Sequence, residues 1–282
     1  MKEAAKHSIS AIALTDHDTV NGLEEAAQTA GELGIRFIPG VELEIIWRED
    51  SSYAGAVNAG GEFHLLGLGL NRLTPDFLAA VEELARRREE RNLEIVDRMN
   101  KAGIAASYDE IRVLAGVPES HGPMDYGHSI GRPHFAAFLA KRKIVRNREQ
   151  AFTRYLGRGK PFYIPKAGLE FERAVTAIHG SGGIAVLAHP MSLYVSWGRL
   201  PDLIKNLKEK GLDGLEAWHP STKVSACKRL EALGKSLGLS VTAGSDFHGE
   251  ARPDRKLGIT AGGKKIDEAL INPNIPLCLS QD

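Results

Sequence analysis

The sequence has very little cysteine, no net charge and no long hydrophobic run. Its two cysteines, Cys227 and Cys278, are isolated, which argues against a disulfide framework and against a thiolate zinc site. No apolar run approaches the roughly 20 residues that a membrane-spanning helix needs. The first ten residues contain neither the apolar segment nor the cleavage site of a secretory signal. We therefore expect a cytoplasmic protein with no membrane partner.

Positive and negative charges balance in this sequence, which excludes a function that depends on a large net charge. Lys and Arg together number 36, as do Asp and Glu, so the formal net charge is zero. The whole chain therefore has no global electrostatic attraction to nucleic acids or membranes, although local basic patches remain open. With 282 residues, 43% of them hydrophobic, the composition is that of one large globular domain or two modest ones.

Short apolar runs alternate with segments of helical spacing over most of the chain. This alternation predicts βα units around a mainly parallel sheet, and the nearly continuous apolar character of the runs suits burial on both faces. The predicted strands are 10–16, 35–44, 63–70, 183–190, 212–218, 239–246 and, as a final short run, 275–280; the predicted helices are 23–33, 170–178 and 224–237.

The segment 71–166 interrupts this alternation. Thr74 and Pro75 suit the N-cap and first position of a long helix, and Gly103 suits its C-cap. Further helices are predicted at 108–114, 133–142 and 149–156. The sequence thus predicts an all-α insertion subdomain at 71–166, between the two parts of an α/β core at 1–70 and 167–282.

Imidazole and carboxylate groups follow the predicted strands. In a β/α barrel the C-terminal strand ends meet at one mouth, so these side chains are expected to gather there. Ligands of this type without thiolate suit Zn²⁺, Mn²⁺ or Fe²⁺. A single such group is more often turn chemistry, but several apolar runs end in this way. The groups are Asp16, His17, Asp18, Glu42, His189, Glu216, Asp246 and His248, with His219 ambiguous.

His64 fits this pattern less well, because it precedes its apolar run instead of following it. We expect it on a short strand that enters from the rim, unless the strand begins elsewhere.

Two basic stretches in the insertion suit phosphate. Arg132 and His134 flank Pro133 at the start of a predicted helix, where the helix N-terminus and a guanidinium both favour an anion. An exposed helix start explains them equally well. Arg158 and Lys160 lie in a glycine-rich turn and could face phosphate or solvent.

The ordered motifs resemble a known family. "TDHDT", "GVELE", "HLLGLGL", "AHP" and "GSDFH" occur in the order typical of the PHP (polymerase and histidinol phosphatase) phosphoesterases. The stretches "RPHFAAFLAKRKIV" and "AFTRYLGRGKPFYIP" resemble the branch that contains nucleoside 3′,5′-bisphosphate phosphatases and 5′–3′ exoribonucleases. The resemblance covers essentially the whole chain.

The resemblance implies a distorted (βα)₇ barrel that holds up to three divalent ions, often Mn²⁺, Fe²⁺ or Zn²⁺. The implied substrate is a phosphorylated nucleotide or a short oligonucleotide, and the implied reaction is phosphate ester hydrolysis. By motif, the metal ligands are His17, Glu42, His64, His189, Asp246 and His248. The predicted catalytic residues are His189 and Asp16, with His189 as a candidate proton donor to the leaving oxygen. The predicted phosphate-binding residues are Arg132, His134, Arg158 and Lys160.

One family motif is absent. A first strand ending in D-x-H-x-H-S is expected before "TDHDT", whereas Met1 is followed by what looks like the tail of a helix. Three explanations compete: a coding start placed too late, a true truncation, or a pseudoenzyme. We favour the first because the later ligands are intact. We expect fewer than three ions and weak or no activity in the chain as it stands.

Two other functions remain open. A histidinol-phosphate-type phosphatase of small molecules is disfavoured by the insertion, whose basic stretches suit a larger phosphorylated ligand. A non-catalytic nucleotide-binding protein would bind nucleotide whether or not a chelator is present.

Overall fold

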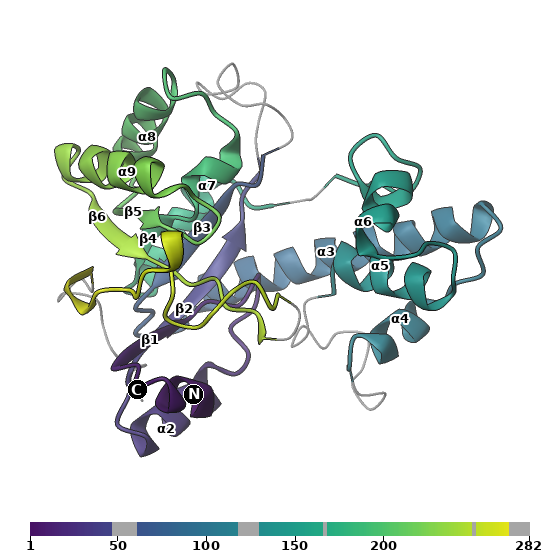
Figure 1. Cartoon of the computed structure of the whole chain (residues 1–282), viewed down its shortest axis with the longest axis horizontal. Coiled ribbons are helices and arrows are strands. Elements are labelled where there is room, and N and C mark those ends of the chain that lie inside the picture. Colours follow the sequence, from purple (N-terminus) through teal and green to yellow (C-terminus); the bar gives the residue numbers. More distant parts are fainter. Residues whose placement is uncertain (47–60, 118–129, 166–167, 250–251, 271–282) are drawn as a thin grey trace. The chain divides into compact units, whose positions relative to one another are not determined.

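The computed structural model describes residues 1–46, 61–117, 130–165, 168–249 and 252–270 (Figure 1). The chain divides into two compact units, of which the first combines Met1–Ala80 with Leu169–Asp282 and the second is Val81–Gly168. The strand predicted at 275–280 lies outside the described residues. None of the helices in the described ranges has both the length and the apolar character needed to cross a bilayer.

The first unit contains a six-stranded sheet in the order β1-β2-β3-β4-β5-β6. The pairs β1/β2, β4/β5 and β5/β6 are parallel, whereas β3 runs antiparallel to both of its neighbours. The strands are β1 (Ala11–Leu14), β2 (Arg36–Glu44), β3 (His64–Leu68), β4 (Ile184–Leu187), β5 (Gly214–Trp218) and β6 (Ser240–Ala243). All six are shorter than the apolar runs predicted.

Helices cover this sheet and bury its apolar side chains. Helix α2 packs on β2, α7 on β4, and α9 on β5 and β6 (Figure 1). Leu65 and Val186, from the central strands, are fully buried, as expected for strands with apolar contacts on both faces. The helices of this unit are α1 (Lys2–Lys6), α2 (Leu23–Glu32), α7 (Phe171–Gly180), α8 (Leu200–Glu209) and α9 (Val224–Ser236), with short 3₁₀ helices at Pro190–Leu193, Ala261–Gly263 and Glu268–Leu270.

The direction of β3 explains the position of His64. Glu44, the last residue of β2, pairs with His64, the first residue of β3. The start of an antiparallel strand therefore lies at the same sheet edge as the C-terminal ends of its neighbours β2 and β4. The prediction of a short strand that brings His64 in from this edge agrees with the structure.

The second unit is helical. Helix α3 (Pro75–Lys101) begins in the first unit, and the amide of Phe77 donates to the hydroxyl of Thr74, the predicted N-cap. The unit continues with α4 (Tyr108–Leu114), α5 (Arg132–Lys141) and α6 (Arg148–Ala151). The stretch predicted as helical at 149–156 is helical, but it is not α-helical throughout. After α6 the backbone turns into a π-helix, Phe152–Leu156, and the amide of Gly157 donates to the carbonyl of Phe152, five residues back.

The core of this helical unit is its own. Met99 on α3, Ile111 on α4 and Phe135 on α5 are fully buried in one apolar cluster. Burying one such side chain stabilises the fold by roughly 1.5–3 kcal/mol. The cluster therefore fixes the position of the first turn of α5, which carries Arg132 and His134, relative to α3 and α4.

Candidate metal centre

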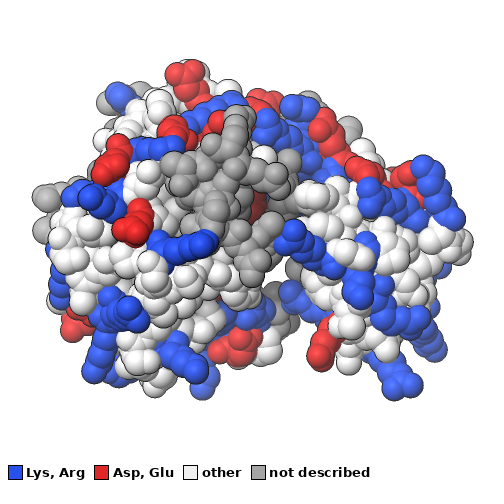
Figure 2. All heavy atoms as spheres, turned by 90° about the horizontal axis from the view of Figure 1, so that it is seen from above, with Lys and Arg blue, Asp and Glu red and all other residues white. Residues whose placement is uncertain are grey.

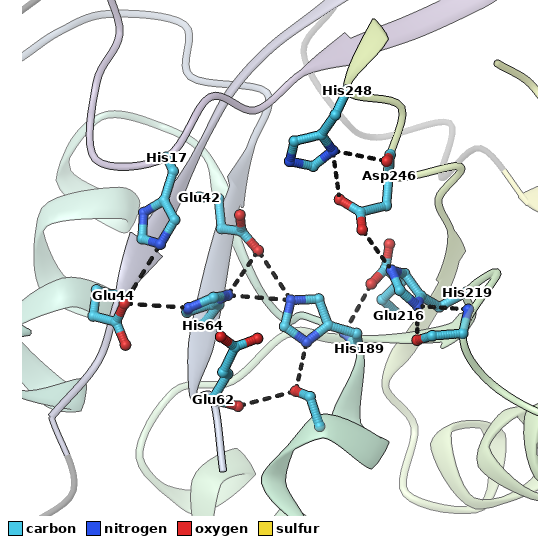
Figure 3. A network of polar contacts seen from close by, with 12 residues as sticks. His17, Glu42, Glu44, Glu62, His64, His189, Glu216, His219, Asp246 and His248 are labelled. Atoms are coloured by element: carbon cyan, nitrogen blue, oxygen red, sulfur yellow. Dashed lines mark hydrogen bonds and ion pairs between the residues drawn. The ribbon is translucent and has the colours of Figure 1, made fainter. Parts of the chain in front are cut away.

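Three ligand atoms from three strand ends lie close together in the first unit (Figure 3). Nδ1 of His64 is 3.1 Å from Oε1 of Glu42 and 3.2 Å from Nε2 of His189, and Oε1 of Glu42 is 3.1 Å from the same Nε2. Bonds of about 2.1 Å at tetrahedral angles place ligand atoms roughly 3.4 Å apart. These three atoms, which we call the ligand triangle, therefore fit a single divalent ion.

His17 lies on the other side of His64. The two imidazole rings are 4.7 Å apart between centroids, and each directs its Nε2 at Oε2 of Glu44, at 3.4 Å from His17 and 3.3 Å from His64. Ligand atoms of His17, Glu42 and His64 all lie within 4.8 Å of one another, a grouping that could also hold a metal ion. Nδ1 of His17 is in turn 3.2 Å from Oδ2 of Asp18.

Burial and charge together polarise this cluster. Burial alone disfavours the charged form of His64, but the charge of Glu42 and hydrogen bonds to Glu42 and Glu44 raise its pKa to about 10. Burial likewise opposes the charge of Glu42, yet His64 and His189 hold the pKa of that carboxyl well below its ordinary value. Without an ion, His64 is therefore an imidazolium between two carboxylates. A bound cation would take the place of its positive charge.

His189 is held in a strained backbone conformation. Its φ of 27° and ψ of 64° are unusual for a residue other than glycine. Its amide donates to Oε2 of Glu216 at 2.7 Å, and burial raises the pKa of that carboxyl despite the neighbouring histidines. Asp18 and Asp246 also have positive φ, 56° and 47°. Strain of this kind concentrates at sites where the surrounding structure imposes side-chain position.

A second cluster surrounds Asp246. Its Oδ1 is 3.3 Å from Nδ1 of His248, and its Oδ2 is 3.3 Å from Nε2 of His219 and 3.5 Å from the guanidinium of Arg255. Burial opposes the charge of Asp246, but the hydrogen bond to His219 and the charge of His248 leave its pKa lowered. The ring of His219 is 5.3 Å from that of His189, between centroids, so the two clusters adjoin through these imidazoles.

The structure thus brings all six predicted ligands to one sheet edge, in two groups. His17, Glu42, His64 and His189 form the first, and Asp246 with His248 forms the second. Asp16, predicted as catalytic, is an exposed residue two positions after the end of β1, and its carbonyl accepts a hydrogen bond from the amide of Glu42.

The predicted phosphate-binding residues all belong to the helical unit. Arg132 lies with its guanidinium over the ring of Tyr163, 5.3 Å from the centroid. Nδ1 of His134 accepts from the amide of Gly131 at 3.1 Å, which caps α5, and burial lowers the pKa of this imidazole. Arg158 and Lys160 are exposed in the turn after the π-helix.

Glu44 was missed by the sequence reasoning. Only 6% of its surface is exposed, and it contacts both His17 and His64. Successive side chains of a strand alternate between faces, so Glu42 and Glu44 share one face of β2. That spacing of two residues was visible in "GVELE" and could have identified Glu44. Nothing local to the sequence indicates Arg255, whose partner Asp246 is brought to it by the fold.

Comparison with known proteins gives a consistent result. A 5′–3′ exoribonuclease of Haemophilus influenzae is 32% identical over 245 residues, 87% of this chain and 81% of the relative. A 3′,5′-nucleoside bisphosphate phosphatase of Chromobacterium violaceum is 31% identical over 257 residues, 91% and 83% of the two chains. The crystal structure of a protein described as a metal-dependent phosphoesterase, from Bifidobacterium adolescentis, matches with a TM-score of 0.76 and 26% identity, over 95% of this chain and 86% of the other.

The expectation of a PHP-type α/β fold is therefore confirmed by both fold and sequence. The model of the PHP domain matches residues 1–156, more than half of the sequence, and the chain belongs to the PHP domain family.

Proposed function

We propose that this chain is a metal-dependent phosphoesterase that hydrolyses phosphate esters of nucleotides. The candidate reactions are removal of the 3′-phosphate from a 3′,5′-bisphosphonucleotide and stepwise hydrolysis of short RNA from its 5′ end. The observation that carries the proposal is the ligand triangle, because three donor atoms from strands far apart in the sequence face one another at 3.1–3.2 Å.

The donor set supports a divalent transition ion. Two imidazole nitrogens and one carboxylate oxygen suit Mn²⁺, Fe²⁺ or Zn²⁺, and none of these three atoms is a sulfur. A bound ion would supply Lewis acidity toward the phosphate ester and an activated water. The proposed ligands are those named by motif: His17, Glu42, His64, His189, Asp246 and His248.

The structure favours His189 as a ligand over His189 as a proton donor. Its Nε2 faces Glu42 and His64, while its Nδ1 is 2.6 Å from the hydroxyl of Ser192. Both nitrogens are thus engaged within the protein. We therefore assign His189 to holding the ion, and Asp16 stays a predicted catalytic residue.

The charge of the helical unit supports a phosphorylated substrate larger than a simple ester. Between Val81 and Gly168 the sequence has seventeen Lys and Arg against eleven Asp and Glu, a formal charge of +6 in a chain whose total is zero. Lys and Arg predominate on the visible face of this unit (right in Figure 2). Cationic side chains of this kind bind the phosphates of a nucleic-acid backbone. We propose that the insertion at 71–166 binds substrate phosphate through Arg132, His134, Arg158 and Lys160.

The test compares three substrates with the metal controlled. The purified chain is incubated with a 3′,5′-bisphosphonucleotide, a short 5′-phosphorylated RNA and histidinol phosphate, each with Mn²⁺ or with EDTA. Because the first family motif is absent, we expect weak Mn²⁺-dependent hydrolysis of one or both nucleotide substrates, abolished by EDTA and by His64→Gln. His7→Gln, which changes an exposed histidine, is the matched control and should hydrolyse the same substrates as the unmodified chain.

The alternative functions give different results. Preferred hydrolysis of histidinol phosphate would identify a small-molecule phosphatase. Nucleotide binding that survives EDTA, without hydrolysis in Mn²⁺, would show a non-catalytic nucleotide-binding protein and overturn the proposal.

A further inference from the structure

Two of the three atoms in the ligand triangle are imidazole nitrogens, and an imidazole binds a metal through a nitrogen that carries no proton. Each histidine of the triangle therefore has to keep its proton on the other nitrogen. The contacts of those other nitrogens, Nδ1 of His189 and Nε2 of His64, decide whether the triangle is ready to bind (Figure 3).

The proton on His189 follows from the hydrogen bonds of Ser192. The Ser192 hydroxyl donates its single proton to the backbone carbonyl of Glu62 at 3.0 Å, since a carbonyl can only accept. The same hydroxyl oxygen lies 2.6 Å from Nδ1 of His189 and so accepts from it. His189 therefore keeps a proton on Nδ1, so the nitrogen that gives up its proton to an ion is Nε2, which faces Glu42 and His64.

Ser192 is itself held in place by backbone hydrogen bonds. Its amide donates to the carbonyl of His189 at 2.9 Å, and its carbonyl accepts from the amide of Glu62 at 3.0 Å. Backbone hydrogen bonds thus hold Ser192, which lies in the 3₁₀ helix after β4, against the segment that precedes β3.

The proton on His64 follows from Glu44. Oε2 of Glu44 is 3.3 Å from Nε2 of His64, and an ionised carboxylate can only accept. Nε2 therefore carries a proton directed at Glu44, and Nδ1 is the nitrogen that faces Glu42 and His189. The amide of Glu44 donates to Oδ1 of Asp18 at 2.8 Å, which anchors the backbone behind this carboxylate.

We propose that Ser192 and Glu44 are positioning residues: they accept hydrogen bonds from the protons that His189 and His64 retain on the nitrogens facing away from the ligand triangle when the other nitrogens bind an ion. This inference rests on the proposed metal site, and deepens it by assigning roles to two residues outside the predicted ligand set. Partners of this kind orient ligand histidines, and their loss typically weakens metal binding by about 10- to 100-fold.

The chain offers matched variants for the test. Ser192→Ala removes the acceptor for Nδ1 of His189, whereas Ser192→Thr keeps a hydroxyl and should rescue binding. Glu44→Leu removes the acceptor for Nε2 of His64, whereas Glu44→Gln keeps an oxygen that accepts. The control is Ser221→Ala, which deletes a hydroxyl 2.7 Å from Nδ1 of His219, a histidine outside the triangle.

Two measurements are made on the full chain, with Zn²⁺ as the probe ion. Competition with a chromophoric chelator gives the Zn²⁺ affinity, and ¹⁵N NMR of histidine-labelled protein shows which nitrogen of each ring carries the proton. We expect Ser192→Ala and Glu44→Leu to bind Zn²⁺ about 10- to 100-fold more weakly. The N–H signals at Nδ1 of His189 and Nε2 of His64 should be lost or shifted in the respective variants. Ser192→Thr and Ser221→Ala should retain both signals.

The outcomes separate this inference from the proposed site. If the unmodified chain binds Zn²⁺ and both Ser192→Ala and Glu44→Leu bind it equally well with unchanged ¹⁵N signals, the positioning roles are wrong while the metal site stands. If the unmodified chain does not bind Zn²⁺, the site and the positioning roles are both overturned.

Discussion

His64 shows how strongly one residue depends on its surroundings at this site. It lies between Glu42 and Glu44, is almost fully buried, and has contacts at both ring nitrogens. The same imidazole in water titrates near its ordinary pKa of 6.5, whereas here the two carboxylates raise the pKa to about 10. The histidine therefore binds a proton much more tightly in the folded protein than in the unfolded chain.

This difference predicts how the stability of the metal-free protein depends on pH. Because the folded pKa of about 10 is above the unfolded value of 6.5, the stabilisation from His64 is fully present below pH 6.5. It is lost as the pH rises toward 10. Urea unfolding in EDTA, measured between pH 6.5 and 9.5, should show a falling free energy of unfolding.

The variant His64→Gln isolates this contribution. It should unfold with a shallower pH dependence over the same range, while His7→Gln on the exposed surface should follow the unmodified chain. Parallel curves for His64→Gln and the unmodified chain would show that His64 does not carry the proton.

At the scale of elements, the sheet edge is built by the direction of β3. Had β3 run parallel to β2, its first residue would lie at the opposite edge, away from Glu42 and His189. Because it is antiparallel, His64 is placed between residues that follow or end two neighbouring strands. The close approach of β1 and β3 to β2, further along the sheet, depends in turn on Gly40.

Gly40→Ala should destabilise the protein by about 1–3 kcal/mol, as overpacking does in a close-packed interior. A Cβ at this position would lie 2.7 Å from the carbonyl oxygen of Gly67 and 2.8 Å from Cγ2 of Thr15. The backbone of β3 cannot yield as a flexible side chain would. Chemical denaturation at constant pH, with metal absent, measures the change.

Gly31→Ala on α2 is the matched control with the opposite expected sign. No atom lies within 4 Å of a Cβ added there, and alanine is favoured over glycine in a helix by up to about 1 kcal/mol. An unchanged or raised stability of Gly40→Ala would show that β1 and β3 do not approach β2 as closely as described.

At the scale of the whole molecule, the proposed ligands and the proposed phosphate-binding residues belong to different compact units. The ligands lie in the unit made of Met1–Ala80 and Leu169–Asp282, and Arg132 lies in Val81–Gly168. Each unit has its own buried apolar clusters. A ligand that binds one of them should therefore stabilise that unit first.

Metal binding should protect the two units unequally from hydrogen exchange. At 100 times its dissociation constant, an ion that binds only the folded state adds about 2.7 kcal/mol of stability. We expect peptides from β2, β3 and β4 to exchange more slowly with Mn²⁺ or Zn²⁺ than with EDTA, whereas α5 peptides should change little. Equal protection of α5 and the strands would contradict the assignment of the ion to the ligand triangle.

Much of the element pattern was readable because its causes are local. Thr74 caps α3 as predicted, and the alternation of apolar runs with helical segments corresponds to the α/β unit. The stretch predicted at 149–156 is helical, but its change to a π-helix was not predicted, because the two helix types differ by one hydrogen-bond register, which residue preferences do not encode. The predicted ends of the strands also differ from the observed ends, because strand pairing depends on neighbours distant in the sequence.

The sequence by itself determined which chemical groups this protein could bring to an ion. Residue type and position beside an apolar run are local properties, so His17, Glu42 and His189 were recognisable without coordinates. Only the tertiary structure decided how those groups meet. His64 and His189 are 125 residues apart, and Ser192 and Glu62 are 130 apart, so the direction of each nitrogen follows from long-range packing.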